Sequence, residues 1–172
     1  MKTGMRLFCL VALLLLAPSM ALSWPAVVLY HTDGDTLEVF SLQTSSTREI
    51  RLYGVDAPET EQAHGVAARE YLREILKPNV TVEILNYGEP DRHKRNVGIV
   101  IYQEKNINAM MVEAGLAWVS PDFCKGRFCK DSRAMQKNAR ENKRGLWQDA
   151  NATPPWEWRK AKRTEAKQHK TQ

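Results

Sequence analysis

The sequence of 172 residues predicts a mixed β fold with helices, in which a five-stranded Greek-key β-barrel is accompanied by about three α-helices. Three observations lead to this fold class. Short runs rich in β-branched and aromatic residues alternate with turn-forming residues, one amphipathic stretch lies between the third and fourth runs, and two further helical stretches follow the fifth. The length suits a single domain with a hydrophobic core.

The first three expected strands form a meander, because only short polar segments separate them. Val, Ile, Leu and Tyr dominate the runs, whereas Asp, Gly, Ser and Thr lie between them. The last two strands are joined by a polar, basic loop over residues 88–96. The five expected strands cover residues 26–30, 36–40, 49–55, 80–87 and 97–102.

Helical periodicity and end signals predict three helices, over residues 65–76, 107–114 and 131–143. Pro78 closes the first helix. Gly115 can supply a left-handed cap to the second, and Asp131 or Ser132 can cap the start of the third.

The amino terminus is typical of a secretion signal over residues 1–23. A basic start precedes an apolar run over residues 7–16, and small residues then form a cleavage site at Ala21-x-Ser23. The alternative is a permanent membrane anchor, but a spanning helix needs about 20 apolar residues. We therefore expect export to the periplasm or the medium, with no stable membrane anchoring after cleavage.

Cys124 and Cys129 are the two cysteines that remain after signal removal. In an oxidising compartment such a pair is expected to form a disulfide. The alternative is a metal site, but the segment between them offers no further Cys or His to complete a tetrahedral shell.

Residues 24–158 are expected to form the folded domain, and residues 159–172 a basic tail almost free of large apolar groups. Such a tail buries too little surface to offset its ordering entropy, so we expect a frayed or loosely helical end. Signal removal also lowers the formal net charge from +5 to +3, because two basic residues leave with it. A modest positive charge suits an anionic partner.

Three separated clusters carry groups that phosphodiester hydrolysis needs: residues 33–36, residues 51–59 and residues 91–95. Catalysis must neutralise charge on the phosphoryl oxygens and activate a water molecule. Asp35 and Asp56 can supply carboxylate oxygens to a hard divalent cation, with a backbone carbonyl and waters completing the shell.

Arginine and glutamate side chains in the same clusters suit the other half of that chemistry. Arg51 and Arg95 can hold the remaining phosphoryl oxygens through paired, charge-assisted hydrogen bonds, a geometry that lysine does not reproduce. Glu59 can accept a proton from the attacking water or orient it. Each signal alone is weak, because Asp-Gly and Asp-x-Pro-Glu segments often form turns.

In their order and spacing, however, these motifs make the chain resemble the staphylococcal nuclease, or thermonuclease, family over residues 27–158. The shared pattern comprises Asp33-Gly34-Asp35-Thr36, Arg51-Leu52-x-Gly54-Val55-Asp56-Ala57-Pro58-Glu59, Asp91 through Arg95, Gly115-Leu116-Ala117 and Gly145-Leu146-Trp147.

The resemblance implies an OB-type barrel and a monomeric, Ca²⁺-dependent enzyme that cuts DNA, RNA or both endonucleolytically and leaves 3′-phosphate ends. It implies that Asp35, Asp56 and the carbonyl of Ala57 bind calcium. It also assigns a role in catalysis to three residues, Arg51, Glu59 and Arg95. A further phosphate contact is expected from Arg92, and base stacking from Phe123.

Two departures from the family pattern stand out. His93-Lys94 occupies the place of Tyr-Gly before the second arginine; if that turn requires a positive φ, Lys94 costs about 1 kcal/mol there. After Gly115-Leu116-Ala117 the chain offers Trp118, which suits the core equally well, as well as Phe123.

Two other classes of function compete with the hydrolase. A barrel that binds nucleic acid without cutting it would gain nothing from three carboxylates beside the phosphate, since they weaken anion affinity. A secreted interaction domain could use the basic tail on acidic surfaces, but this leaves the carboxylate cluster without a purpose.

Overall fold

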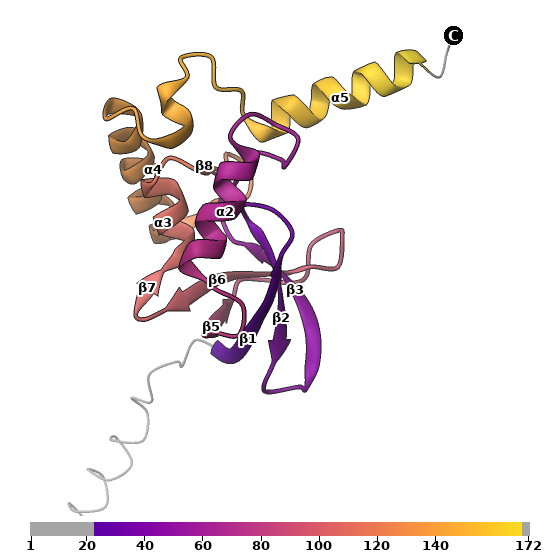
Figure 1. The fold of residues 1–172 in the computed structure, drawn as a ribbon, viewed down its shortest axis with the longest axis vertical. Coiled ribbons are helices and arrows are strands. Elements are labelled where there is room, and N and C mark those ends of the chain that lie inside the picture. Colours follow the sequence, from indigo (N-terminus) through magenta and orange to yellow (C-terminus); the bar gives the residue numbers. More distant parts are fainter. Residues whose placement is uncertain (1–22, 170–172) are drawn as a thin grey trace, which may run out of the picture.

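The computed structural model describes residues 23–169, which form a barrel covered by helices at one end, with a long C-terminal helix projecting from it (Figure 1). The expected secretion signal, residues 1–23, lies outside the described residues except for Ser23, which starts the first strand. None of the helices within residues 23–169 combines the length and apolarity of a membrane span.

Five strands close into the barrel, which confirms the fold class. Strand β1 pairs antiparallel with β2 and β5, β2 with β3, and β5 with β6, while a parallel pairing between β3 and β6 closes the ring. The first three strands form the expected meander. The barrel strands are β1 (Ser23–His31), β2 (Thr36–Ser41), β3 (Ser46–Leu52), β5 (Thr81–Asn86) and β6 (Asn96–Tyr102).

The interior of the barrel is filled by the alternating side chains of these strands. Ala26 and Val28 of β1, and Leu37 and Val39 of β2, are fully buried, whereas Glu38 between them faces solvent. This period of two fixes the pairing register, because a slip by one residue would expose every apolar side chain. The register in turn fixes which strand ends lie together at the candidate active site.

The third expected strand, over residues 49–55, is in fact two elements. Strand β3 ends at Leu52, and a separate strand β4 (Val55–Asp56) pairs with β8 (Trp118–Val119). The break falls at Gly54, whose φ of 74° is incompatible with a continuing strand. A further short strand, β7 (Lys105–Asn106), pairs antiparallel with the end of β6.

Two of the three expected helices are confirmed. Helix α2 (Gly65–Ile75) buries Ala68 and Leu72 against the barrel. Helix α3 (Ile107–Glu113) starts with a side-chain cap from Asn106, and Gly115 follows its end with the expected positive φ of 71°.

The third helix starts earlier than the sequence predicted, and the expected caps are wrong. Helix α4 spans Gly126–Glu141, with Lys125 at its N-cap, so Asp131 and Ser132 lie inside the helix. The Ser132 hydroxyl donates to the carbonyl of Phe128 one turn earlier. Burial of the first turn explains the earlier start, since Cys129 is fully buried in the core.

Two glycines lock the end of α3 to the short 3₁₀ helix η2 (Gly145–Gln148). The Leu146 amide donates to the Gly115 carbonyl at 2.9 Å. A β-carbon on Gly115 would lie 2.3 Å from the carbonyl oxygen of Arg144, so only glycine permits this approach. The Gly-Leu-Ala and Gly-Leu-Trp motifs are therefore two halves of one packing contact.

The basic segment after residue 158 is helical. Helix α5 (Pro155–His169) begins before the expected domain end and runs on through it. Its first turn is anchored by Trp156, whose ring lies 5.7 Å from that of Trp118, and Trp118 also packs against Trp147. The rest of α5 extends away from the barrel (Figure 1).

Candidate active site

One cleft of about 720 Å³ brings together every residue to which the sequence assigned a metal-binding, catalytic or substrate-binding role. The residues come from the turn before β2, from strands β3 and β4, from the segment after β4, from the loop between β5 and β6, and from the loop after β8. They are Asp35, Arg51, Asp56, Ala57, Glu59, Arg92, Arg95 and Phe123. Their roles stay predictions, but their convergence is a fact of the fold.

The turn before β2 fixes the Asp35 carboxylate inside the cleft. Asp33 accepts a hydrogen bond from the Asp35 amide at 2.9 Å, and the Ala57 amide donates to Asp35 Oδ2. Gly34 is required for close packing here, because a β-carbon would lie 2.6 Å from that of Ala68 on α2. Asp35 is only 3% exposed, so its orientation is fixed by the fold.

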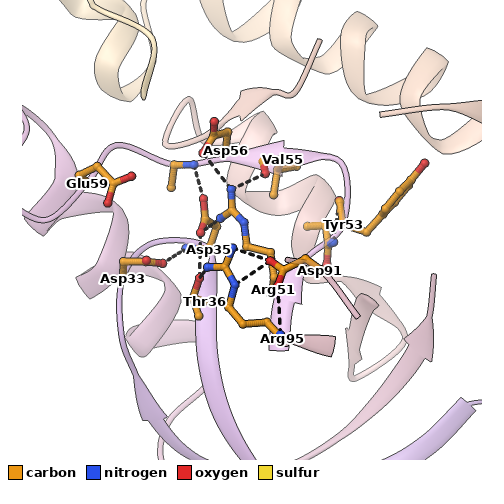
Figure 2. Close-up of polar contacts among 12 residues, drawn as sticks. Asp33, Asp35, Thr36, Arg51, Tyr53, Val55, Asp56, Glu59, Asp91 and Arg95 are labelled. Carbon is orange, nitrogen blue, oxygen red and sulfur yellow. Dashed lines mark hydrogen bonds and ion pairs between the residues drawn. The ribbon is translucent and has the colours of Figure 1, made fainter. Parts of the chain in front are cut away.

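The guanidinium group of Arg51 lies between two carboxylates (Figure 2). Its Nη1 contacts Asp35, and its Nη2 donates to Asp56 Oδ1 at 2.8 Å and to the Val55 carbonyl at 3.2 Å. Burial lowers the pKa of Arg51, and the charge of Asp56 opposes that shift. Because one guanidinium spans both carboxylates, Asp35 and Asp56 converge on a single point.

Asp33 adds a further acidic group at the edge of this cluster. Burial raises the pKa of its carboxyl group, and the nearby charge of Arg51 opposes the shift. Asp33, Asp35 and Asp56 thus place three carboxyl groups around Arg51, and their ionised forms favour the presence of another cation.

The second arginine of the cleft, Arg95, is held by Asp91 in its own loop. Asp91 Oδ2 accepts from Arg95 Nε at 2.9 Å and from Nη2 at 2.7 Å, and Asp91 Oδ1 accepts from the backbone amides of His93 and Arg95. Partial burial acts to raise the pKa of Asp91, but the hydrogen bonds from Arg95 outweigh it and hold that pKa below its ordinary value. The guanidinium also reaches Thr36 Oγ1 at 3.4 Å, next to Asp35.

The turn before Arg95 has the strained backbone that the departure from Tyr-Gly suggested. Lys94 has a φ of 63°, in the left-handed region where a side chain is unfavourable. His93 is exposed, and its Nε2 accepts from Arg92 Nε at 3.1 Å. The loop thus keeps Arg92 at the rim of the cleft despite the altered sequence.

The sequence did not predict a fourth arginine in the cleft, Arg159 from α5. Its Nη2 lies 2.7 Å from Asp56 Oδ2, and its Nη1 lies 2.7 Å from Glu59 Oε1. Hydrogen bonds to Asp56 raise the pKa of Arg159 above its ordinary value. The sequence places Arg159 in the expected basic tail. Its position one helical turn after Trp156, which packs against Trp118, is the feature that would have predicted its place near the barrel.

The oxygen atoms of Asp35, Asp56 and the Ala57 carbonyl fit a hard divalent cation, although a guanidinium group contacts each of the two carboxylates. Within residues 23–169, no group of three or more His, Cys, Asp or Glu side chains is arranged to hold a metal ion. The expected site requires only two, Asp35 and Asp56, with the carbonyl of Ala57 and waters. Carboxylate and carbonyl oxygens are the ligands that calcium prefers, and the excess of acidic groups supplies the charge.

Three aromatic side chains line the cleft. Phe123 is 76% exposed, as a stacking surface requires, whereas Trp118 is buried and belongs to the core. Tyr53 and Tyr87 also line the cleft, with ring centroids 3.5 Å apart, and were not singled out by the sequence. The cleft therefore has three aromatic rings in its lining, whereas we expected one.

The structure contains the expected disulfide between Cys124 and Cys129. It packs directly under the turn between β3 and β4, where a β-carbon on Gly54 would lie 2.6 Å from Cys124 Sγ. The Tyr53 hydroxyl donates to the Lys125 carbonyl at 3.0 Å inside the disulfide loop. The bridge thus links the loop of Phe123 to the first turn of α4, and it packs against the turn that follows the strand of Arg51.

Comparisons with known proteins agree with this geometry. Residues 49–149 match the family model described as "Staphylococcal nuclease homologue". The chain belongs to the staphylococcal nuclease family. An "Uncharacterized endonuclease" of Escherichia coli O157:H7 is 36% identical over 149 residues, which cover 81% of this chain and 92% of that protein. This result confirms the resemblance drawn from the motifs.

Two other relatives in the family show similar overlap. A "Micrococcal nuclease" of Shigella flexneri is 37% identical over 139 residues, covering 75% of this chain and 76% of its own. An "Uncharacterized endonuclease" of Haemophilus influenzae is 33% identical over 129 residues, covering 75% of this chain and 69% of its own. The match to the family model begins two residues before Arg51 and so includes most of the cleft.

Proposed function

We propose that this protein is a secreted, calcium-dependent nuclease that hydrolyses phosphodiester bonds of DNA, RNA or both. One observation carries the proposal: in a barrel of the staphylococcal nuclease family, Asp35 and Asp56 converge on the same point, with Arg51, Arg95 and Glu59 around it. Relatives named as nucleases or endonucleases in three bacteria support the same class of activity.

Arg51 and Arg95 bind the scissile phosphate in this mechanism. Both guanidinium groups can donate charge-assisted hydrogen bonds to the phosphoryl oxygens, where negative charge increases in the transition state. Arg51 does so by exchanging its contacts to Asp35 and Asp56 for contacts to the phosphate. Asp91 holds Arg95 in place through two hydrogen bonds, so little side-chain freedom is lost when the phosphate binds.

Asp35, Asp56 and the carbonyl of Ala57 would hold the calcium ion. When bound, calcium supplies a positive charge that polarises the phosphate and favours ionisation of a nearby water. The burial of Asp35 and Asp56 keeps both carboxylates in position before the cation arrives.

Glu59 lies at the edge of the carboxylate pair and acts on the attacking water, either as general base or by orienting it. The water gives up a proton as its oxygen bonds to phosphorus, the bond from phosphorus to the 5′ oxygen breaks, and that oxygen takes up a proton from the solvent and leaves as the 5′ hydroxyl. The product then carries a 3′-phosphate. Bases of the strand stack on Phe123.

The disulfide supports export, because such bridges persist in oxidising compartments. We propose a periplasmic or extracellular location and a monomeric enzyme. Fractionation of cells that express the full chain, followed by size-exclusion chromatography, tests both points. A cytosolic protein with free thiols, or a stable dimer, would contradict them.

Digestion of plasmid DNA with calcium, and in parallel with a chelator, tests the activity. We expect calcium-dependent fragments with 3′-phosphate ends from the wild type. Glu59→Gln should lower turnover by at least about a hundredfold while nucleotide binding persists. If the wild type binds DNA but never cuts it, the protein is a non-catalytic binding module instead.

A further inference from the structure

Helix α5 gathers four of its basic residues on one face. Successive residues of an α-helix turn by about 100°, which places Arg159, Lys160, Arg163 and Lys167 within one sector of about 100°. The two acidic residues, Glu157 and Glu165, fall outside this sector, with Glu165 on the opposite side of the helix. A sequence of mixed charges therefore becomes a helix with one basic face.

This basic face begins inside the catalytic cleft. Arg159 lines the cleft and contacts Asp56 and Glu59 at 2.7 Å. Arg163 and Lys167 follow at intervals of four residues, so each lies about 6 Å further along the helix on nearly the same side. Because α5 extends away from the barrel (Figure 1), the basic residues that follow Arg159 lie progressively further from the cleft.

Packing does not account for this pattern. Residues 161–168 are all exposed, so this part of α5 gains little from the core. Like charges four residues apart destabilise a helix, and Arg159, Arg163 and Lys167 repeat that spacing. Lys162 lies off this face, 3.9 Å from Glu165 and over the Trp158 ring. A helix of this kind gains stability from an anionic partner along its basic face.

We propose that the basic face of α5, formed by Arg159, Lys160, Arg163 and Lys167, binds backbone phosphates of the nucleic-acid strand as it leaves the catalytic cleft. The proposal rests on the proposed function, since it needs a nucleic-acid substrate in the cleft. Lysine and arginine recognise phosphates without reading bases, so this contact adds affinity and length preference without sequence preference.

Binding in the absence of catalysis tests the proposal. In a chelator, fluorescence anisotropy is measured with labelled single-stranded DNA of about 12 nucleotides and of about three nucleotides, the latter too short to reach past the cleft. Each measurement is repeated over a range of salt. One phosphate contact contributes about 0.7 to the slope of log affinity against log salt.

Arg163→Gln and Lys162→Gln form a matched pair, because each removes one positive charge from adjacent positions of the same helix. We expect Arg163→Gln to lower the salt slope for the longer strand by about 0.7, and R163Q combined with K167Q by about 1.4. Lys162→Gln should leave the slope unchanged. All the variants should bind the trinucleotide like the wild type, and far-UV circular dichroism confirms that α5 is intact.

Several results would overturn the proposal. Equal losses for R163Q and K162Q would show an effect of net charge alone, and an unchanged slope would show that the strand does not reach α5. If the wild type binds phosphatidylglycerol vesicles and R163Q weakens that binding without lowering the salt slope for the longer strand, the basic face serves a membrane surface instead. Wild-type cleavage with an unchanged slope refutes this inference alone, whereas no cleavage by the wild type refutes the proposed function.

Discussion

Arg51 and Arg95 are expected to grip the same phosphate, but the fold holds them in different ways. Arg51 lies on strand β3 in the barrel wall, where its register with β2 and β6 fixes its position, and its partners Asp35 and Asp56 are the expected calcium ligands. Arg95 lies at the end of a loop, and its partner Asp91 has no other expected role. The barrel thus positions one guanidinium, whereas a dedicated carboxylate positions the other.

Arg159 is a third case, because it contacts both carboxylate oxygens of Asp56 and shares Oδ1 with Arg51. The Arg51 side chain is 17% exposed and that of Arg159 is 34% exposed. Arg51 belongs to the barrel, whereas Arg159 belongs to a helix anchored mainly through Trp156. We therefore infer that calcium displaces Arg159 from Asp56 more readily than it displaces Arg51.

Arg51→Lys should have the largest effect of the substitutions discussed here. A lysine ammonium cannot make the paired hydrogen bonds of a guanidinium, although the charge is retained. We expect kcat to fall by about a thousandfold, measured by steady-state cleavage of a single-stranded oligonucleotide in saturating calcium. Arg69→Lys on α2, outside the cleft, is the matched control. Activity within a fewfold of the wild type would remove Arg51 from the mechanism.

Asp91→Asn should have an intermediate effect, because it frees Arg95 without touching the calcium ligands. We expect kcat/KM to fall by about tenfold to a hundredfold, while calcium binding in the absence of substrate is unchanged. A change in calcium affinity of the same size would show that Asp91 acts on the metal instead.

The pH dependence of the Asp91–Arg95 pair has a defined sign. The pKa of Asp91 is lower in the folded protein than in the unfolded chain, so its stabilising contribution is present above the ordinary carboxylate pKa. This contribution is lost as the pH falls from that value through the lower folded pKa. Asp91→Asn should therefore flatten the stability curve only in that acidic window, as measured by urea unfolding.

Arg159→Gln should have a smaller effect, and we expect it to strengthen calcium binding. Removal of a competing cation leaves Asp56 and Glu59 free for calcium, so we expect calcium to bind about fivefold more tightly, as for an ion pair worth about 1 kcal/mol. Isothermal titration without substrate measures this directly. Arg163→Gln, which lacks contacts to either carboxylate, is the control. Weaker calcium binding by R159Q would show that Arg159 assists the metal.

The motifs predicted the cleft better than periodicity predicted its surroundings. Asp35, Arg51 and Asp56 could be found because each lies in a short motif at a strand end, where chain geometry leaves little freedom. Arg159 could not, because its position depends on the packing of Trp156 against Trp118, a contact between segments far apart in the sequence. The start of α4 was also missed, because burial of Cys129 outweighs the capping preference of Asp131 and Ser132.

Lys94→Gly should have the smallest effect and would sharpen the contrast between loop and barrel. Glycine adopts the φ of 63° at this position without steric cost, but it also gains more freedom in the unfolded chain. The net stabilisation should be about 0.5–1 kcal/mol, measured by urea unfolding. Lys125→Gly, at an extended position with φ of −129°, is a matched control and should not stabilise the protein. If K94G also raises kcat/KM, strain in this turn limits how well Arg95 is placed; if it changes stability alone, Asp91 is sufficient to hold that guanidinium.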